Sequence, residues 1–113
     1  MKSVEIDPAI EANPLLLSSV LRAQELLEME STRSSNTVSA TWKLVRDDRN
    51  AQFIRLAIAD WSGRAETTFS PETHKNHDQV RGRMIRLWGD LLQIRSHKLV
   101  EEMQAAASVT EEN

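Results

Sequence analysis

The sequence predicts an α+β fold with the element order α-β-β-β-α: an N-terminal helix, a three-stranded antiparallel β-meander and a long C-terminal helix, with the helices packed on one face of the sheet. Two observations predict it. Apolar residues recur at helical spacing over residues 14–30 and again over 78–107, whereas between these segments they alternate with a period of two. A three-stranded sheet with one apolar face needs cover, and two helices supply it.

The first helix is expected over residues 14–30. Asn13 followed by Pro14 is a typical N-cap and first-helical-position pair. The residues at helical spacing behind this pair are Leu16, Val20, Ala23 and Leu27. The short polar side chains of "STRSSN" end the helix, because they compete for backbone hydrogen bonds. Residues 1–12 carry no comparable pattern, and we expect them to be loosely ordered.

Three strand-like segments follow, around "VSATWKL", "AQFIRLAIAD" and "RAETTFS". The turns "DDRN" and "DWSG" separate them, and Gly63 in the second turn suits a backbone with positive φ. Because both turns are short, the three strands are expected to pair as consecutive antiparallel neighbours.

The alternation also predicts the register of the strands. If Ile58 opposes Ala65, the apolar positions of the second and third strands share one face. Trp42 joins that face when it opposes Leu56, which requires a first loop of odd length or a bulge. A slip of one residue would set Trp42 against Arg55 instead, which is a favourable cation–π pair.

The C-terminal helix is expected to begin at Asp78, which can cap it, and to end near Ala107. Before it, Ser70 and Pro71 repeat the cap-plus-proline signature, so "SPETH" is expected to form a helical turn. Residues 108–113 are expected to form a disordered acidic tail. The folded unit is then a single domain over residues 13–107.

Two kinds of residue form parallel rows along this C-terminal helix. The broad apolar arc that suits the sheet consists of Val80, Met84, Leu87, Trp88, Leu91 and Ile94. A second apolar row repeats every seven residues at Ile85, Leu92 and Leu99, and the small residues Gly82, Gly89 and Ser96 repeat beside it. After Ile94 the apolar positions rotate to Leu99, Val100, Met103 and Ala106.

Glycine inside a helix costs about 1 kcal/mol relative to alanine. Close approach by another helix backbone would offset the cost of Gly82 and Gly89, and a seven-residue period suits a partner that crosses at a shallow angle. That partner is either the first helix of the same chain or the same helix of a second copy. Because the C-terminal helix overshoots the predicted sheet, we expect a homodimer.

The composition excludes several classes of protein. The chain has 113 residues, of which 40% are hydrophobic and 27% charged, as in an ordinary globular domain. No apolar run approaches 18 residues and the N-terminus has no apolar core, so neither a membrane span nor a signal peptide is expected. The absence of cysteine excludes disulfides and thiolate chemistry. We expect a cytoplasmic protein without a cofactor.

Nucleic-acid binding is the alternative function. Residues 31–100 carry twelve bases and seven acids, a net charge of +5, between two acidic ends. The arginines that could contact phosphates are Arg46, Arg49, Arg81, Arg83 and Arg86. The element order resembles that of small dimeric nucleoid-associated proteins, and this resemblance implies a DNA-binding dimer. The overall net charge of −3 and the absence of tyrosine argue against it.

Catalytic and metal-binding patterns are weak. His74, His77 and Asp78 have a spacing that could place them on one face of a helical turn, but no second cluster lies nearby and Asp78 is more simply a cap. No nucleophile, phosphate-loop or dinucleotide motif occurs. We therefore expect neither a metal site nor an enzyme.

Two further residues are candidates for partner contacts. Arg95 lies near the centre of the apolar arc, where it could pair with Glu25 or Glu28, extend past the sheet edge, or pair across a dimer interface. Trp61, at a turn, either folds over the end of the core or contacts a partner. The sequence thus predicts a small, non-catalytic interaction or regulatory module that forms a homodimer through its C-terminal helix.

Overall fold

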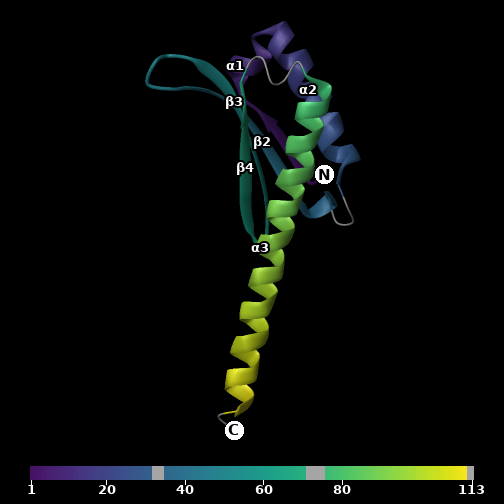
Figure 1. Ribbon diagram of the computed structural model, residues 1–113, viewed down its shortest axis with the longest axis vertical. Helices are drawn as coiled ribbons and strands as arrows, with labels where there is room; N and C mark the ends of the chain where they lie inside the picture. Colours follow the sequence, from purple (N-terminus) through teal and green to yellow (C-terminus); the bar gives the residue numbers. More distant parts are fainter. Residues whose placement is uncertain (32–34, 71–75, 112–113) are drawn as a thin grey trace.

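The computed structural model describes residues 1–31, 35–70 and 76–111, and it has the predicted α+β class (Figure 1). Its elements are β1 (Ser3–Ile6), α1 (Pro8–Glu11), α2 (Pro14–Met29), the 3₁₀ helix η1 (Ser35–Thr37), β2 (Ser39–Arg46), β3 (Gln52–Asp60), β4 (Gly63–Phe69) and α3 (His77–Glu111). The strands form one sheet in the order β1-β2-β3-β4. The helices cover one face of this sheet, and α3 runs down past its end.

The N-terminal segment differs from the expectation that residues 1–12 are loosely ordered. Strand β1 pairs with β2 in parallel, with Ile6 opposite Trp42, and makes the sheet four-stranded. Asp7 caps α1 through the N–H of Ala9 at 2.9 Å, and its other carboxylate oxygen accepts the N–H of Leu44 at 3.1 Å. These backbone donors, that of Ala9 most of all, lower the pKa of Asp7. The Asp7 carboxylate therefore adds to the strand pairing that holds the N-terminal segment to the sheet.

Helix α2 confirms the predicted first helix. The side-chain oxygen of Asn13 accepts the N–H groups of Leu15 at 3.2 Å and Leu16 at 3.3 Å, which are two of the donors that a helix leaves unpaired at its start. Pro14 occupies the first helical position. The buried side of the helix consists of Val20, Ala23, Gln24 and Leu27.

The strand register is the one that the alternation predicts. Ile58 lies opposite Ala65, and Trp42 lies opposite Leu56, not Arg55. The first loop has odd length because it spans residues 47–51, between the end of β2 and the start of β3. It is closed by Asp47, whose Oδ1 accepts backbone N–H groups at 2.9 Å, and by Asn50, whose φ is 63°.

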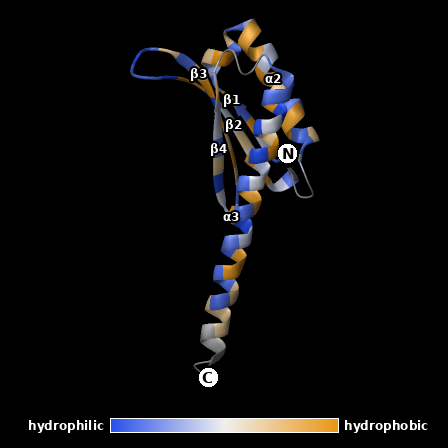
Figure 2. Cartoon of the chain, viewed as in Figure 1, coloured by the Kyte–Doolittle hydropathy of each residue, from blue (hydrophilic) through white to orange (hydrophobic). Residues whose placement is uncertain are grey.

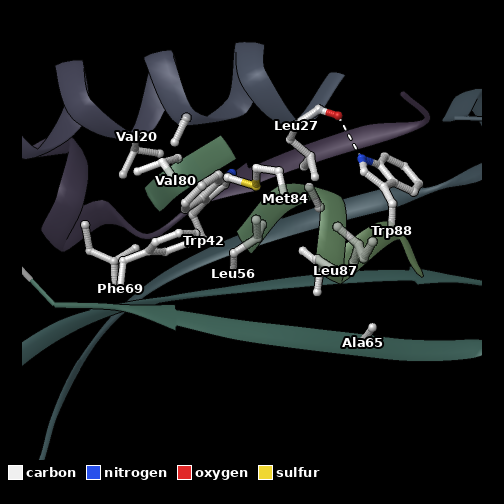
Figure 3. Packing of buried hydrophobic residues seen from close by; sticks show 14 of the residues in the cluster. Val20, Leu27, Trp42, Leu56, Ala65, Phe69, Val80, Met84, Leu87 and Trp88 are labelled. Carbon is white, nitrogen blue, oxygen red and sulfur yellow. Dashed lines mark hydrogen bonds between the residues drawn. The ribbon is translucent and has the colours of Figure 1, made fainter. Parts of the chain in front are cut away.

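The core lies between the helices and the sheet (Figure 3). Trp42 and Phe69 stack with ring centroids 6.1 Å apart. Both buried indoles have partners: Trp42 Nε1 donates to Gln24 Oε1 at 2.8 Å, and Trp88 Nε1 donates to the carbonyl oxygen of Leu27 at 2.8 Å. The hydrogen bond from Trp88 joins α3 to α2 and fixes the side of α3 that α2 covers.

The second turn holds the end of the sheet against α3. Gly63 has a φ of +154°, and a Cβ built on it would lie 2.8 Å from Cγ2 of Ile94. The expected positive φ is thus confirmed, and this glycine also permits a close approach to the long helix.

Both ends of α3 differ from the prediction. Asn76 caps the helix in place of Asp78, because its side-chain oxygen accepts the N–H of Gln79 at 3.2 Å. The helix continues past Ala107 to Glu111, through part of the expected disordered tail. The expected "SPETH" turn lies on residues 70–74, of which only Ser70 is described. In the described part of the chain, no helix is both long and apolar enough to span a membrane.

Candidate interaction surface on the C-terminal helix

The sheet-facing side of α3 consists of the residues that the helical period predicts. Val80, Met84, Leu87, Trp88 and Leu91 are buried, and Ile94 is partly buried at the edge of the core. These side chains lie within the first five turns of the helix. The packed part of α3 therefore ends near Arg95.

A second apolar row on α3 remains uncovered by the described residues of the chain. We define the α3 stripe as Ile85, Leu92, Leu99 and Met103, whose exposed fractions are 50%, 38%, 48% and 70%. Val100 beside it is 49% exposed. Large apolar side chains that gather on one helical face in this way are typical of an interaction surface.

The last part of α3 has no sheet beneath it. Thirty-five residues at 1.5 Å each give a helix about 52 Å long. The molecule measures 61 × 32 × 23 Å, and the helix accounts for its long axis. We define the projecting arm as residues 96–111. Figures 1 and 2 show it extending below the sheet with apolar and polar residues interspersed.

The row of small residues faces outward. A Cβ added at Gly82 or Gly89 would meet no described atom within 4 Å beyond the helix's own backbone, and Ser96 is exposed. Helix α2 is therefore not a partner that approaches these glycines, although the sequence left that possibility open. The seam of Gly82, Ile85, Gly89, Leu92, Ser96 and Leu99 lies on the surface of the single chain.

Arg95 pairs with a residue that the sequence did not suggest. Its Nε donates to Asp60 Oδ2 at 2.5 Å, in place of the expected Glu25 or Glu28. The Asp60 side chain is fully buried and that of Arg95 is 13% exposed. No local pattern links the two residues, which lie 35 positions apart. The pair anchors the β3–β4 turn to α3 at the point where the helix leaves the sheet.

Two opposing effects set the ionisation of Asp60. Burial raises the pKa of its carboxyl group, but hydrogen bonds from the side chain and backbone of Ser62, at 2.6 and 2.8 Å, and from Arg95 outweigh it. The pKa of Asp60 is therefore lowered overall, and the pair is ionised at neutral pH. Nη2 of Arg95 is buried and has no hydrogen-bond partner among the described residues.

Trp61 remains available to a partner. It lies at the tip of the β3–β4 turn with 57% of its surface exposed, so it does not fold over the end of the core. A shallow groove beside it is lined by Lys2, Asn36, Ser39 and Asp60, among others. This groove lies at the sheet and is separate from the α3 stripe.

No protein-family model, curated protein or solved structure matches the chain. The surface must therefore be interpreted from its own geometry and charge.

The described residues include no group of three or more histidine, aspartate or glutamate side chains that could hold a metal ion. Of the weak metal pattern, His74 lies outside the described residues, and His77 and Asp78 lie exposed in the first turn of α3.

Three of the arginines that were candidates for nucleic-acid contact have partners within the chain. Arg81 Nε lies 2.7 Å from Glu30 Oε1, and this hydrogen bond raises the pKa of the guanidinium. Arg83 donates to the carbonyl oxygen of Thr68 at 2.8 Å and lies over the Phe69 ring. Arg46 donates to Asn50 at 3.0 Å.

The candidate arginines are not gathered into one basic surface. Arg46 ends β2 and Arg49 lies in the β2–β3 turn, and this hairpin end projects away from α3 in Figure 1. Arg86 lines a groove between β4 and α3, but Glu66 and Asp90 line the same groove. Their carboxylates reduce the positive potential that phosphates would meet.

Proposed function

We propose that the protein is a non-catalytic interaction module that forms a homodimer through the α3 stripe. The observation that carries this proposal is an apolar row that continues from the packed part of α3 onto an arm with no cover from the described residues. An exposed face of this kind on a monomer would leave large apolar side chains in water without any compensating contact.

Energetic considerations support a partner for the arm. Isolated helices of about 15 residues are marginal in water, because most helical stability in proteins comes from packing of an apolar face. The exposed contact between His97 Nε2 and Glu101 Oε1, at 3.1 Å, adds little to that stability. Covering each half-exposed leucine or methionine of the stripe would contribute about 1 kcal/mol. A second copy brings the same stripe and doubles the apolar area buried.

The remaining contacts of α3 favour this surface over the others. Helix α2 occupies the side of α3 marked by the bond between Trp88 and Leu27, and the sheet occupies the adjoining side. The stripe is the large apolar surface of α3 that is left. The arginine partners described above favour self-association over nucleic-acid binding, since three of the five candidate side chains are engaged within the chain.

Light scattering of the purified chain at micromolar concentration tests the proposal. We expect about twice the chain mass of 12.8 kDa. Leu92→Glu and Leu99→Glu should each convert the dimer to monomer, because they place a charge in the apolar contact. Leu15→Glu is the matched control, since Leu15 is 82% exposed on α2, away from the stripe.

Two results would overturn the proposal. A monomeric mass at 100 μM would contradict self-association itself. A dimer that survives both substitutions in the stripe, or that Leu15→Glu disrupts equally, would place the interface elsewhere.

A further inference from the structure

We propose that two copies pair with their α3 helices antiparallel, so that the projecting arm of each copy lies along the packed half of α3 in the other. This inference rests on the self-association proposed above and adds its orientation. It follows from two independent features of α3: the sizes of the side chains in its two rows, and the distribution of charge along its length.

The first feature is the alternation of large and small residues. Two rows occupy the core positions of a seven-residue repeat: Gly82, Gly89 and Ser96 form one, which Met103 continues, and the stripe residues Ile85, Leu92 and Leu99 form the other. In a parallel helix pair each row meets its own copy, so glycine would face glycine and leucine would face leucine. In an antiparallel pair each row meets the other row.

Antiparallel pairing therefore sets large side chains into the spaces above small ones. The space is present, because an added Cβ at Gly82 or Gly89 meets no described atom within 4 Å. Small residues at such positions let helix backbones approach closely and increase the contact made by the large side chains opposite. A parallel pair would alternate layers in which glycine faces glycine with layers in which leucine faces leucine. The first would leave space unfilled and the second would be crowded, so the helices would pack less well.

The second feature is the charge along α3. Residues 77–95 carry four arginines and two aspartates, but Arg81 and Arg95 pair with Glu30 and Asp60 of the same chain, so the packed half is close to neutral. The arm, residues 96–111, carries one lysine and three glutamates, a net charge of −2. Parallel pairing would set the two acidic arms side by side, whereas antiparallel pairing sets each acidic arm against the nearly neutral packed half.

One register satisfies the size feature in two of three pairs. Setting Ile85 opposite Met103 of the second copy also sets Gly89 opposite Leu99 and Leu92 opposite Ser96, so that a large side chain meets a small one in these last two pairs and Ile85 packs against the large Met103. Every member of the stripe is then covered. The same register sets the acidic arm of each copy alongside the packed half of α3 in the other.

Engineered disulfides test the orientation directly, because the chain contains no cysteine. Ile85→Cys and Met103→Cys are prepared with different tags and are mixed under reducing conditions so that subunits can exchange, and the mixture is then oxidised. We expect a cross-linked product that contains one copy of each variant. Neither variant alone should cross-link to itself. In this register, Ile85 of one copy lies 18 residues along the helix from Ile85 of the other, and the same separation holds for Met103. At 1.5 Å per residue, this is about 27 Å, too far for a disulfide.

A parallel pair predicts the reverse. Each variant alone would cross-link efficiently to itself, and mixing the two variants would not increase the yield of cross-linked product. Gln104→Cys is the control for random collision, because Gln104 is exposed and lies about 100° around the helix from Met103. Self-cross-linking of Ile85→Cys or Met103→Cys above that control would overturn the antiparallel arrangement.

Light scattering of the same variants in their reduced form separates this inference from the function on which it rests. A monomer would remove both proposals. A dimer in which the single variants cross-link to themselves would remove only the orientation. A dimer without any product above the Gln104→Cys control would place the contact away from the stripe and would overturn both.

Discussion

The two halves of α3 belong to one continuous helix with one apolar period, yet their side chains have opposite environments. Leu91 in the packed half is fully buried, whereas Leu99, little more than two turns later, is 48% exposed. Both leucines occupy positions that the same periodicity marks as apolar. Helical periodicity therefore identifies which residues share a face, but it does not show what that face will meet.

The boundary between the halves is set by the length of the sheet. Strands of seven to nine residues extend about 25–30 Å, whereas α3 extends about 52 Å. The β3–β4 turn marks the end of the sheet, where Gly63 abuts Ile94 and Asp60 holds Arg95. Beyond that turn the described residues offer α3 no further surface, so a second molecule is the source of cover that we propose.

The largest expected effect is the difference in stability between matched leucine substitutions in the two halves of α3. Leu91→Ala should lower the free energy of unfolding by about 3 kcal/mol, because it leaves a cavity in a fully packed site. Leu99→Ala should change the free energy of unfolding by less than about 0.5 kcal/mol in dilute solution, because the Leu99 side chain makes few buried contacts within a single chain. Urea denaturation followed by tryptophan fluorescence measures both. Equal losses would contradict the contrast between the halves.

The second prediction concerns the pair at the boundary. Arg95→Met should cost about 3 kcal/mol, because among the described residues it leaves the buried Asp60 carboxylate with the hydrogen bonds of Ser62 alone. Arg64→Met is the matched control, since Arg64 pairs with Glu66 at 3.0 Å in an exposed position, where such pairs contribute less than about 1 kcal/mol. Urea unfolding at pH 7 distinguishes the two variants.

The same pair predicts the acid sensitivity of the fold. The pKa of Asp60 is lowered in the folded state, so its contribution is present above its unfolded pKa, near pH 4, and is lost as the pH falls through the folded value. The stability of the native chain should therefore fall between pH 5 and pH 3. Arg95→Met should show a shallower fall, because part of the interaction that lowers this pKa is gone. An identical slope in both proteins would mean that Ser62 alone sets the ionisation.

Much of the fold could be predicted because it depends on local pattern. The Asn13 cap, the pairing of Ile58 with Ala65 and the sheet-facing side of α3 all follow from turn chemistry or from a period along the chain. Strand β1 could not be predicted in this way. It has four residues, and it exists because the edge of β2 accepts its backbone in parallel, which depends on chain more than 30 residues away.

The candidate surface was predictable in its residues but not in its surroundings. The sequence identifies the small row and three residues of the stripe, Ile85, Leu92 and Leu99, because both series repeat every seven residues. It does not show that α2 leaves Gly82 and Gly89 open, since that depends on the side of α3 to which Trp88 attaches α2. The partner of Arg95 was missed for the same reason, because Asp60 is brought to it by the fold alone.

The smallest expected effect comes from adding a single methyl group to each of two glycines. Gly63 packs against α3, whereas Gly82 lies open on the surface of α3. Gly63→Ala should destabilise the chain by about 1–2 kcal/mol, because φ is +154° and the new Cβ would press on Ile94. Gly82→Ala should stabilise it by up to about 1 kcal/mol in dilute solution, because the site is open and alanine favours the helix. Thermal unfolding should therefore shift in opposite directions. A destabilised Gly82→Ala chain, measured where it is monomeric, would mean that a backbone of the same molecule already occupies the space that we assign to a second copy.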